Sequence, residues 1–100
     1  MIQHTVTFTL KHPAGSAEET DFLKTGMGLA EIPTVRNFRC LRQIGKKCSF
    51  RFGFSMEFDS NEAYEEYNHH PVHQDFVAAR WIPEVSDFLE LDYIEAAVSG

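Results

Sequence analysis

The amino-acid sequence predicts one α+β domain, in which helices cover one face of a four-stranded antiparallel sheet. The chain has 100 residues, which is close to the usual size of a single compact domain. Segments that alternate apolar and polar residues, typical of strands, are interspersed with segments of helical spacing. The helical segments suffice to cover only one side of four strands. The other side of the sheet must therefore be polar or must meet another molecule.

The first strand is expected at residues 2–10, where apolar and polar side chains alternate. Its apolar face includes His4, and its opposite face is rich in threonine. After a turn at residues 13–15, Ser16 is placed to cap a helix whose first turn is acidic. We expect this helix to end before Pro33. Its buried stripe is expected to consist of Leu23, Met27 and Ala30, with Phe22 and Leu29 alongside.

The remaining elements follow the same reasoning. A second strand is expected over residues 35–44, with imperfect alternation, and a third over residues 50–58, where aromatic and small or polar side chains alternate. Asp59 or Ser60 can cap a short helix, which a histidine pair before Pro71 interrupts. Pro71 suits the first position of a new helix, since its missing N–H would have no partner there. Pro83 bends or ends that helix, and a fourth strand is expected over residues 88–94.

The order strand, helix, strand, strand, helical pair, strand is the split βαβ, or ferredoxin-like, arrangement. We assign residues 1–95 to the domain and residues 96–100 to a flexible C-terminal tail.

Composition limits the partners and the location of the protein. Nine basic against fifteen acidic residues give a formal charge of -6, which does not favour binding to nucleic acid. No apolar run approaches the roughly 20 residues needed to span a bilayer, and the first residues read as a strand, so no membrane is expected and a cytoplasmic location is predicted. Cys40 and Cys48 have neither disulfide-framework nor zinc-knuckle spacing, and both are expected to be free thiols.

Several segments together carry a family resemblance. They are Ile2-Gln3-His4-Thr5-Val6, Ile32-Pro33 followed by Val35, Met56-Glu57-Phe58, Tyr67 three residues before His70-Pro71 and then His73, and the closing Asp92-Tyr93. Over roughly residues 2–94 the chain resembles the stress-responsive A/B barrel, or Dabb, family. The resemblance implies a dimeric α+β barrel, a homodimer in which the uncovered faces of two sheets pack together.

The resemblance also implies a candidate site. Plant polyketide cyclases that resemble this sequence use a strand-one histidine, the final histidine of the His-Pro-x-His stretch and a tyrosine to close a ring by aldol condensation. By motif these residues are His4, His73 and Tyr67, and such acid–base chemistry uses no cofactor. A small apolar or aromatic ligand would then bind against walls expected to include Phe8, Phe52, Phe54, Phe76 and Trp81.

The residues by themselves leave alternatives open. His4 can be a hydrogen-bonded core histidine, and at least one of Tyr64 and Tyr67 can serve in core packing. A metal site at His69, His70 and His73 is not expected, because Pro71 breaks the helix register.

Three functions compete. The first is a small-molecule site, catalytic or merely binding; the second is a non-enzymatic stress or structural homodimer with no ligand and a filled core. The third is a monooxygenase-like activity, which the resemblance to the wider dimeric α+β barrel group implies because monooxygenases of that group use a tryptophan, here matched by Trp81. The arginines of the second strand, Arg36, Arg39 and Arg42, either form a solvated face or pair with Glu90 and Asp92 of the fourth.

Overall fold

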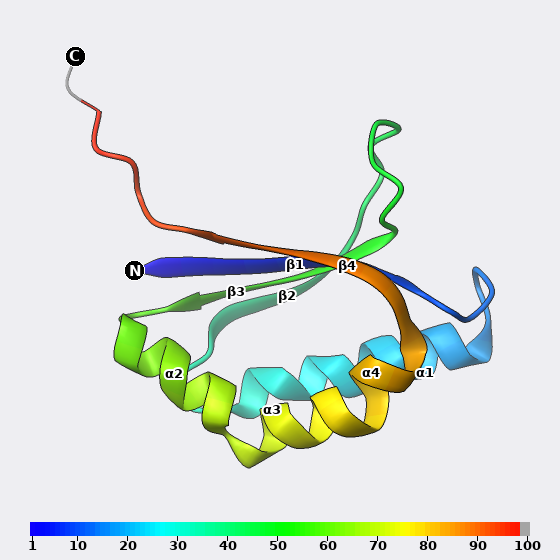
Figure 1. Cartoon of the computed structure of the whole chain (residues 1–100), viewed down its shortest axis with the longest axis horizontal. Coiled ribbons are helices and arrows are strands. Elements are labelled where there is room, and N and C mark those ends of the chain that lie inside the picture. The colour runs from blue at the N-terminus through cyan, green and yellow to red at the C-terminus, as the bar shows by residue number, and fades with distance from the viewer. Residues whose placement is uncertain (99–100) are drawn as a thin grey trace.

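The protein is a four-stranded antiparallel sheet with all of its helices on one face, as seen in a computed structural model that describes residues 1–98 (Figure 1). The strands are β1 (Ile2–Leu10), β2 (Arg36–Arg42), β3 (Phe52–Phe58) and β4 (Val85–Tyr93), in the spatial order β2-β3-β1-β4. The split βαβ prediction is therefore confirmed.

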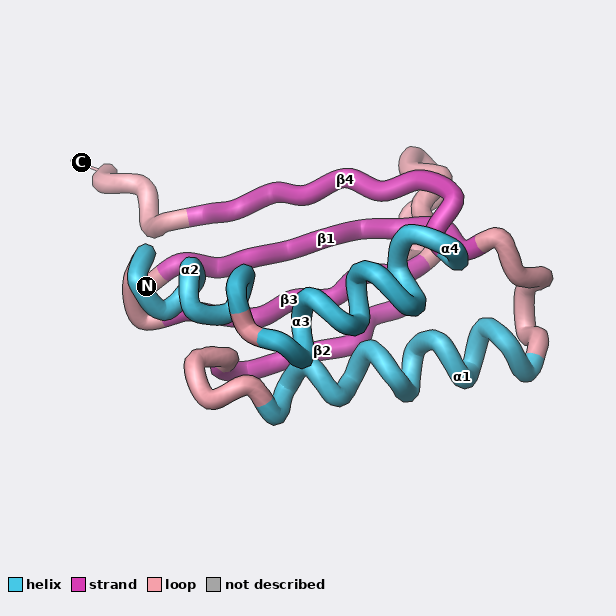
Figure 2. Tube along the Cα trace, turned by 60° about the horizontal axis from the view of Figure 1, so that its bottom comes forward, coloured by secondary structure: helices cyan, strands magenta, loops and turns pink. Residues whose placement is uncertain are grey.

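The helical layer has two parts. Helix α1 (Ala17–Gly26) continues into a 3-10 turn, η1 (Met27–Glu31). The second part comprises α2 (Asn61–His69), α3 (Pro71–Phe76), a π-helical turn η2 (Val77–Trp81) and α4 (Ile82–Glu84). Figure 2 shows both parts lying over the strands. Within residues 1–98, no helix has the length and apolar character that crossing a membrane requires.

The central strand β1 pairs with both neighbours and divides the molecule into a buried and an uncovered face. His4, Val6, Phe8 and Leu10 are buried beneath the helices, while the threonines between them lie on the uncovered face, as predicted. In β3, Met56, Phe54 and Phe52 lie opposite His4, Val6 and Phe8 in turn. The alternation of β1 therefore places His4 and the aromatic core on the same side of the sheet.

The buried stripe of α1 differs from the prediction. Phe22, Gly26 and Leu29 are buried, whereas Met27 and Ala30 are exposed. The tighter 3-10 turn after Gly26 changes the helical phase, which keeps Leu29 on the sheet side and turns Met27 toward solvent. Gly26 itself lies against the core, because a Cβ at this position would be 2.4 Å from Cζ of Phe54.

A shift in register accounts for the imperfect alternation of apolar and polar residues in β2. The register of β2 with β3 shifts between Arg36 and Arg39, where Asn37 has a φ of 50°, a left-handed conformation that asparagine tolerates. The pairing of the β2 arginines with Glu90 and Asp92 does not occur within the chain, because β2 and β4 form opposite edges of the sheet. Arg36 instead pairs with Asp59, at 3.0 Å between Nε and Oδ2.

The fourth strand begins three residues earlier than predicted. Helix α4 ends at Glu84, directly after Pro83, and the chain enters β4 at Val85 without a loop. After β4 the chain leaves the sheet on the side away from the helices (Figure 1). Of the predicted flexible tail, residues 99 and 100 lie outside the described residues, and the division at residue 95 stays a prediction.

Cys40, half-buried in β2, and Cys48, exposed in the following loop, are both free.

Gly26 offers a test of the packing of α1 on the sheet. We expect Gly26→Ala to lower the free energy of unfolding by about 1–2 kcal/mol, because the overpacking against the Phe54 ring outweighs the better helix propensity of alanine. Urea unfolding followed by circular dichroism measures this change. The matched control is Gly28→Ala, where nothing lies within 4 Å of the added methyl group and stability should stay equal or rise. Equal stabilities for the two variants would contradict the close approach.

Candidate functional site

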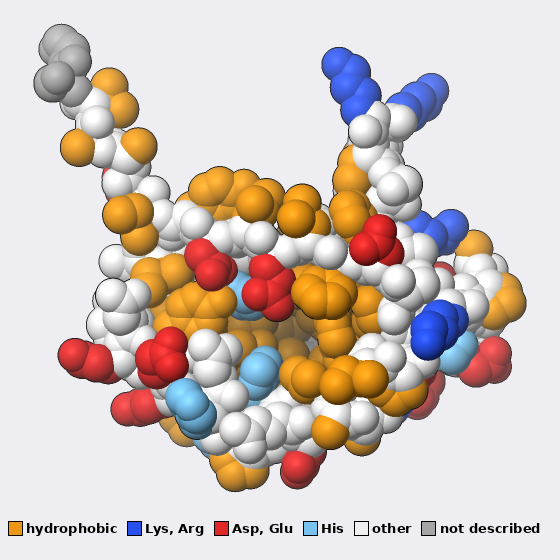
Figure 3. All heavy atoms as spheres, in the orientation of Figure 1, with side chains coloured by type: hydrophobic (Ala, Val, Ile, Leu, Met, Phe, Trp, Pro, Cys, Tyr) orange, Lys and Arg blue, Asp and Glu red, His pale blue; other side chains and the backbone are white. Residues whose placement is uncertain are grey.

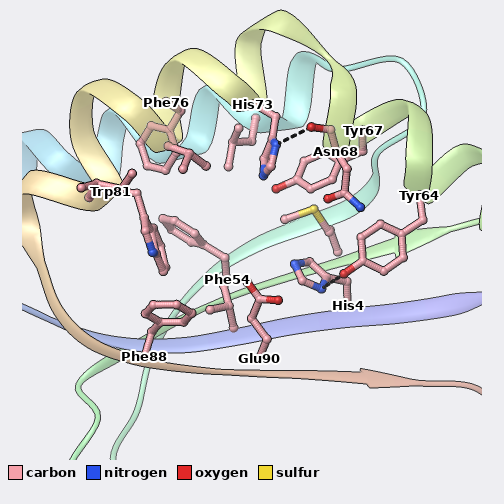
Figure 4. A pocket seen from close by; sticks show the side chains of 15 residues that line it. His4, Phe54, Tyr64, Tyr67, Asn68, His73, Phe76, Trp81, Phe88 and Glu90 are labelled. Carbon is pink, nitrogen blue, oxygen red and sulfur yellow. Dashed lines mark hydrogen bonds between the residues drawn. The ribbon is translucent and has the colours of Figure 1, made fainter.

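A cavity of about 340 Å³ lies between the sheet and the helices, toward the edge formed by β4 (Figure 3, Figure 4). Figure 3 shows acidic side chains at the sheet edge above this hollow and histidine side chains within and below it. The lining residues come from β1, β3, β4 and the helical layer. They are His4, Val6, Leu29, Phe54, Met56, Tyr64, Tyr67, Asn68, His73, Phe76, Val77, Trp81, Ile82, Phe88 and Glu90.

His4 is held by a carboxylate across the sheet. His4 and Asp92 are directly paired between β1 and β4, and His4 Nδ1 lies 2.5 Å from Asp92 Oδ1. The Tyr64 hydroxyl donates to Asp92 Oδ2 at 3.0 Å and also lies 2.8 Å from His4 Nδ1. Because the carboxylate only accepts, we assign a proton to Nδ1 of His4. His4 is 5% exposed, and its Nε2 faces the cavity (Figure 4).

The local sequence of α3 places His73 over the same cavity. The His70 imidazole caps the helix by accepting the N–H of Val72 at 3.1 Å, and Pro71 occupies the first turn, as predicted. Two residues later, His73 Nδ1 donates to the backbone carbonyl of Asn68 at 3.1 Å, so that Nε2 is left to face the cavity (Figure 4).

The electrostatics of the site favour a neutral His73. Burial lowers the pKa of His73 below its ordinary value, the hydrogen bond to Asn68 acts in the opposite direction, and a positive charge on nearby His4 would lower it again. The neutral ring of His73 is therefore favoured, and the main cause is burial. At pH 7 His73 can accept a proton at Nε2.

Tyr67 lies between the two histidines. Its ring centroid is 6.2 Å from that of His4 and 4.3 Å from that of His73, and its hydroxyl points into the cavity (Figure 4). Burial, followed by the negative charge of Glu90, raises the pKa of Tyr67 well above its ordinary value. The hydroxyl therefore stays protonated and can donate a hydrogen bond to a ligand.

The other half of the cavity is aromatic. Phe54, Phe76, Trp81 and Phe88 form its walls, and the Trp81 and Phe88 rings meet edge to face at 5.5 Å. Trp81 belongs to the π-helical turn, which the N–H of Ile82 closes by bonding to the carbonyl of Val77. Pro83 lacks an N–H and its ring would collide with the carbonyl four residues earlier, which accounts for the widened turn.

The structure brings together most of the residues that the sequence singled out. His4, Tyr67, His73, Phe54, Phe76 and Trp81 all line the cavity. Phe8 and Phe52, also expected to line it, do not: they face each other across β1 and β3 in the closed core, where α1 covers Phe8 with the ring of Phe22 at 5.7 Å. The cavity thus occupies only part of the space on the helix-facing side of the strands, and α1 fills the remainder of that space.

Sequence reasoning missed Tyr64 and Asp92 as partners of His4, and Asn68, Phe88 and Glu90 as lining residues. The available signals were the spacing of three between the two tyrosines and the alternation of Glu90 and Asp92 with leucines. Neither signal sets the register between β1 and β4. In every residue pair that these strands form, the two residues are 75 or more positions apart along the chain. Among residues 1–98, no three His, Cys, Asp or Glu side chains gather in a way that could hold a metal ion.

Comparison with known proteins agrees with the fold. The sequence model of the stress responsive A/B barrel domain (Dabb) matches residues 2–95. No match was found among curated proteins. A solved Dabb family protein with a ferredoxin-like fold from Mesorhizobium loti is 50% identical, with a TM-score of 0.95 and coverage of 96% of this chain and 97% of that chain.

Two more distant structures share the fold. The hydroxynitrile lyase from Passiflora edulis is 16% identical, with a TM-score of 0.82 and coverage of 99% and 96% of the two chains. A dimeric ferredoxin-like protein of unknown function from Thermobifida fusca is 19% identical, with a TM-score of 0.76 and coverage of 92% and 88%.

The burial of His73 predicts its titration. In a proton NMR titration of the folded protein, the His73 ring should titrate below 6.5, whereas in the unfolded chain it should titrate near that ordinary value. Between the two pKa values the unfolded chain binds the additional proton. His73 therefore lowers stability as the pH falls through this range. His73→Gln both assigns the resonance and should remove this part of the pH dependence of unfolding. A His73 titration at or above the midpoint of the unfolded chain would refute the assignment of a buried neutral ring.

Proposed function

The chain belongs to the stress responsive A/B barrel domain family, and from the cavity geometry we propose that it binds a small aromatic carbonyl compound and transfers a proton on it. The observation that carries the proposal is the arrangement of His4 and His73. Each imidazole has its Nδ1 engaged by a protein acceptor and its Nε2 facing one cavity (Figure 4). Two positioned bases that flank a largely apolar cavity are suited to removing a proton from carbon.

The proposed step uses three side chains. Nε2 of His73 takes a proton from the carbon next to the ligand carbonyl, and the Tyr67 hydroxyl donates a hydrogen bond to the enolate oxygen that forms. The enolate carbon attacks a second carbonyl group of the same ligand, which forms a carbon–carbon bond. The imidazolium of His73 returns its proton to the resulting alkoxide. His4, oriented by Asp92 and Tyr64, holds the ligand by accepting a hydrogen bond or serves as a second base.

Two further findings support a ligand. The cavity favours binding over a purely structural homodimer, for which a filled core was expected. A solved neighbour named as a hydroxynitrile lyase has the same fold, so the fold is compatible with lyase chemistry.

Exchange of carbon-bound hydrogen tests the proton-transfer step without knowledge of the natural substrate. In D2O, the folded protein should accelerate deuterium incorporation into the methyl group of acetophenone above the buffer rate, as read by proton NMR. His73→Gln should lose about 100-fold or more of the acceleration, since it lacks the general base, and Tyr67→Phe a similar factor through the lost oxyanion donor.

The matched control is His69→Gln, which removes an exposed imidazole from the outer side of α2 and should leave exchange unchanged. Circular dichroism of each variant separates loss of chemistry from loss of fold. Exchange at the buffer rate with the folded wild-type protein, or equal rates for His73→Gln and wild type, would contradict the proposal.

The uncovered sheet face supports a homodimer. Leu89, Leu91 and Tyr93 are 46–51% exposed and form a strip of apolar side chains along β4. Leu41, which is 46% exposed, adds an apolar side chain on β2 at the opposite edge of the sheet. Several solved structures with this fold are described as dimeric. Two copies packed by this face would be expected to bury about 800 Å² or more each.

Light scattering at micromolar concentration should therefore give twice the chain mass of 11.5 kDa. Leu91→Arg should yield a folded monomer, because it places an unpaired charge in the centre of the apolar strip. Val72→Arg, a similar change at a half-exposed position on α3, serves as the control and should remain dimeric. A mass of one chain for the wild type, or a dimeric Leu91→Arg, would show that this face is not the interface.

A further inference from the structure

One charged side chain stands at the opening of the cavity. Glu90 lies on β4 opposite Val6, is exposed, and directs its carboxylate toward the cavity (Figure 4). Among residues 1–98, no side chain forms a hydrogen bond or an ion pair with this carboxylate, and no lysine or arginine lines the cavity. The carboxylate thus has no protein cation to neutralise it inside the site.

The charge of Glu90 acts on the interior of the cavity. Its negative charge contributes to the raised pKa of Tyr67 and also acts on His73. A second negative charge on a ligand would be repelled here. The same charge opposes an enolate oxyanion that develops beside Tyr67, unless the ligand itself brings a positive group.

The aromatic half of the cavity also attracts positively charged groups. Trp81 and Phe88 meet at 5.5 Å between ring centroids, and Phe54 lies 6.4 Å from Trp81. The faces of such rings carry negative charge density and attract organic cations, most strongly the face of tryptophan. The nearest arginine along the chain, Arg80, is engaged elsewhere, with Asp21 and Glu84.

We propose that the ligand is an aromatic molecule with a positively charged amino group, held between the Glu90 carboxylate and the rings of Trp81 and Phe88. This inference rests on the proposed function, which places a small aromatic ligand in the same cavity. Glu90 is then the residue that determines charge specificity: it favours arylalkylammonium compounds, accepts neutral analogues less well and rejects aromatic carboxylates.

Three probes of similar size and different charge test this proposal: 2-phenylethylammonium, 2-phenylethanol and phenylacetate. Trp81 is the single tryptophan of the chain and lines the cavity, so quenching of its fluorescence reports binding at the site itself. At pH 7 the wild-type protein should bind the ammonium compound on the order of tenfold more tightly than the alcohol, and phenylacetate more weakly still.

Glu90→Gln keeps the shape of the side chain and should bring the three affinities to within about twofold to threefold of one another, while Glu90→Lys should reverse their order. Asp87→Asn is the matched control, because Asp87 lies on the same strand opposite Thr9, on the uncovered face, and its loss removes an equal charge. This variant should retain the wild-type preference.

The outcomes separate the two proposals. Equal binding of the three probes by the wild type, or an unchanged preference in Glu90→Gln, would overturn the charge specificity and leave the aromatic site intact. Absence of binding by all three probes to the folded wild type would overturn the aromatic site, and the charge specificity with it.

Discussion

The pairing of β1 with β3 on one side and β4 on the other is the constraint on which the rest of the structure depends. Because side chains alternate strictly along a strand, one register decides which residues of all three strands face the helices. In the observed register, His4 lies opposite Met56 on one side and Asp92 on the other. A shift of β1 by one residue would turn His4 and Phe8 outward and separate the imidazole from its carboxylate.

The His4–Asp92 hydrogen bond links this register to the chemistry of the cavity. A buried imidazole without a partner would destabilise the fold, and the hydrogen bond to Asp92 removes that penalty. Because the Asp92 side chain remains 43% exposed, its own desolvation costs little. The same bond sets the tautomer, which leaves Nε2 directed into the cavity. One interaction therefore satisfies a core polar group and orients a candidate base.

The helical layer decides where the core is filled and where it is open. Beneath α1, Gly26 lets the helix approach closely enough for Phe54 and Phe22 to stack at 6.5 Å between centroids, and this part of the core is closed. Toward the β4 edge, the break at Pro71 and the π-helical turn before Pro83 direct His73 and Trp81 toward the sheet without filling the space between them. The two prolines thus shape a cavity with a polar half and an aromatic half.

The sequence by itself determined the element order, the helix-facing side of β1 and the capping of α1 and α3, because these depend on local alternation, on Ser16 and on the geometry of Pro71. Motif resemblance also brought His4, Tyr67 and His73 together. The tertiary structure alone decided that Phe8 and Phe52 lie in the closed core, that Met27 faces solvent, and that Tyr64 and Asp92 hold His4. The tertiary structure alone also decided that Glu90 lies at the cavity opening. These features depend on the register of strands far apart in sequence and on the depth at which helices rest on the sheet. Both are set by packing among all the elements together, which no local pattern of residues encodes.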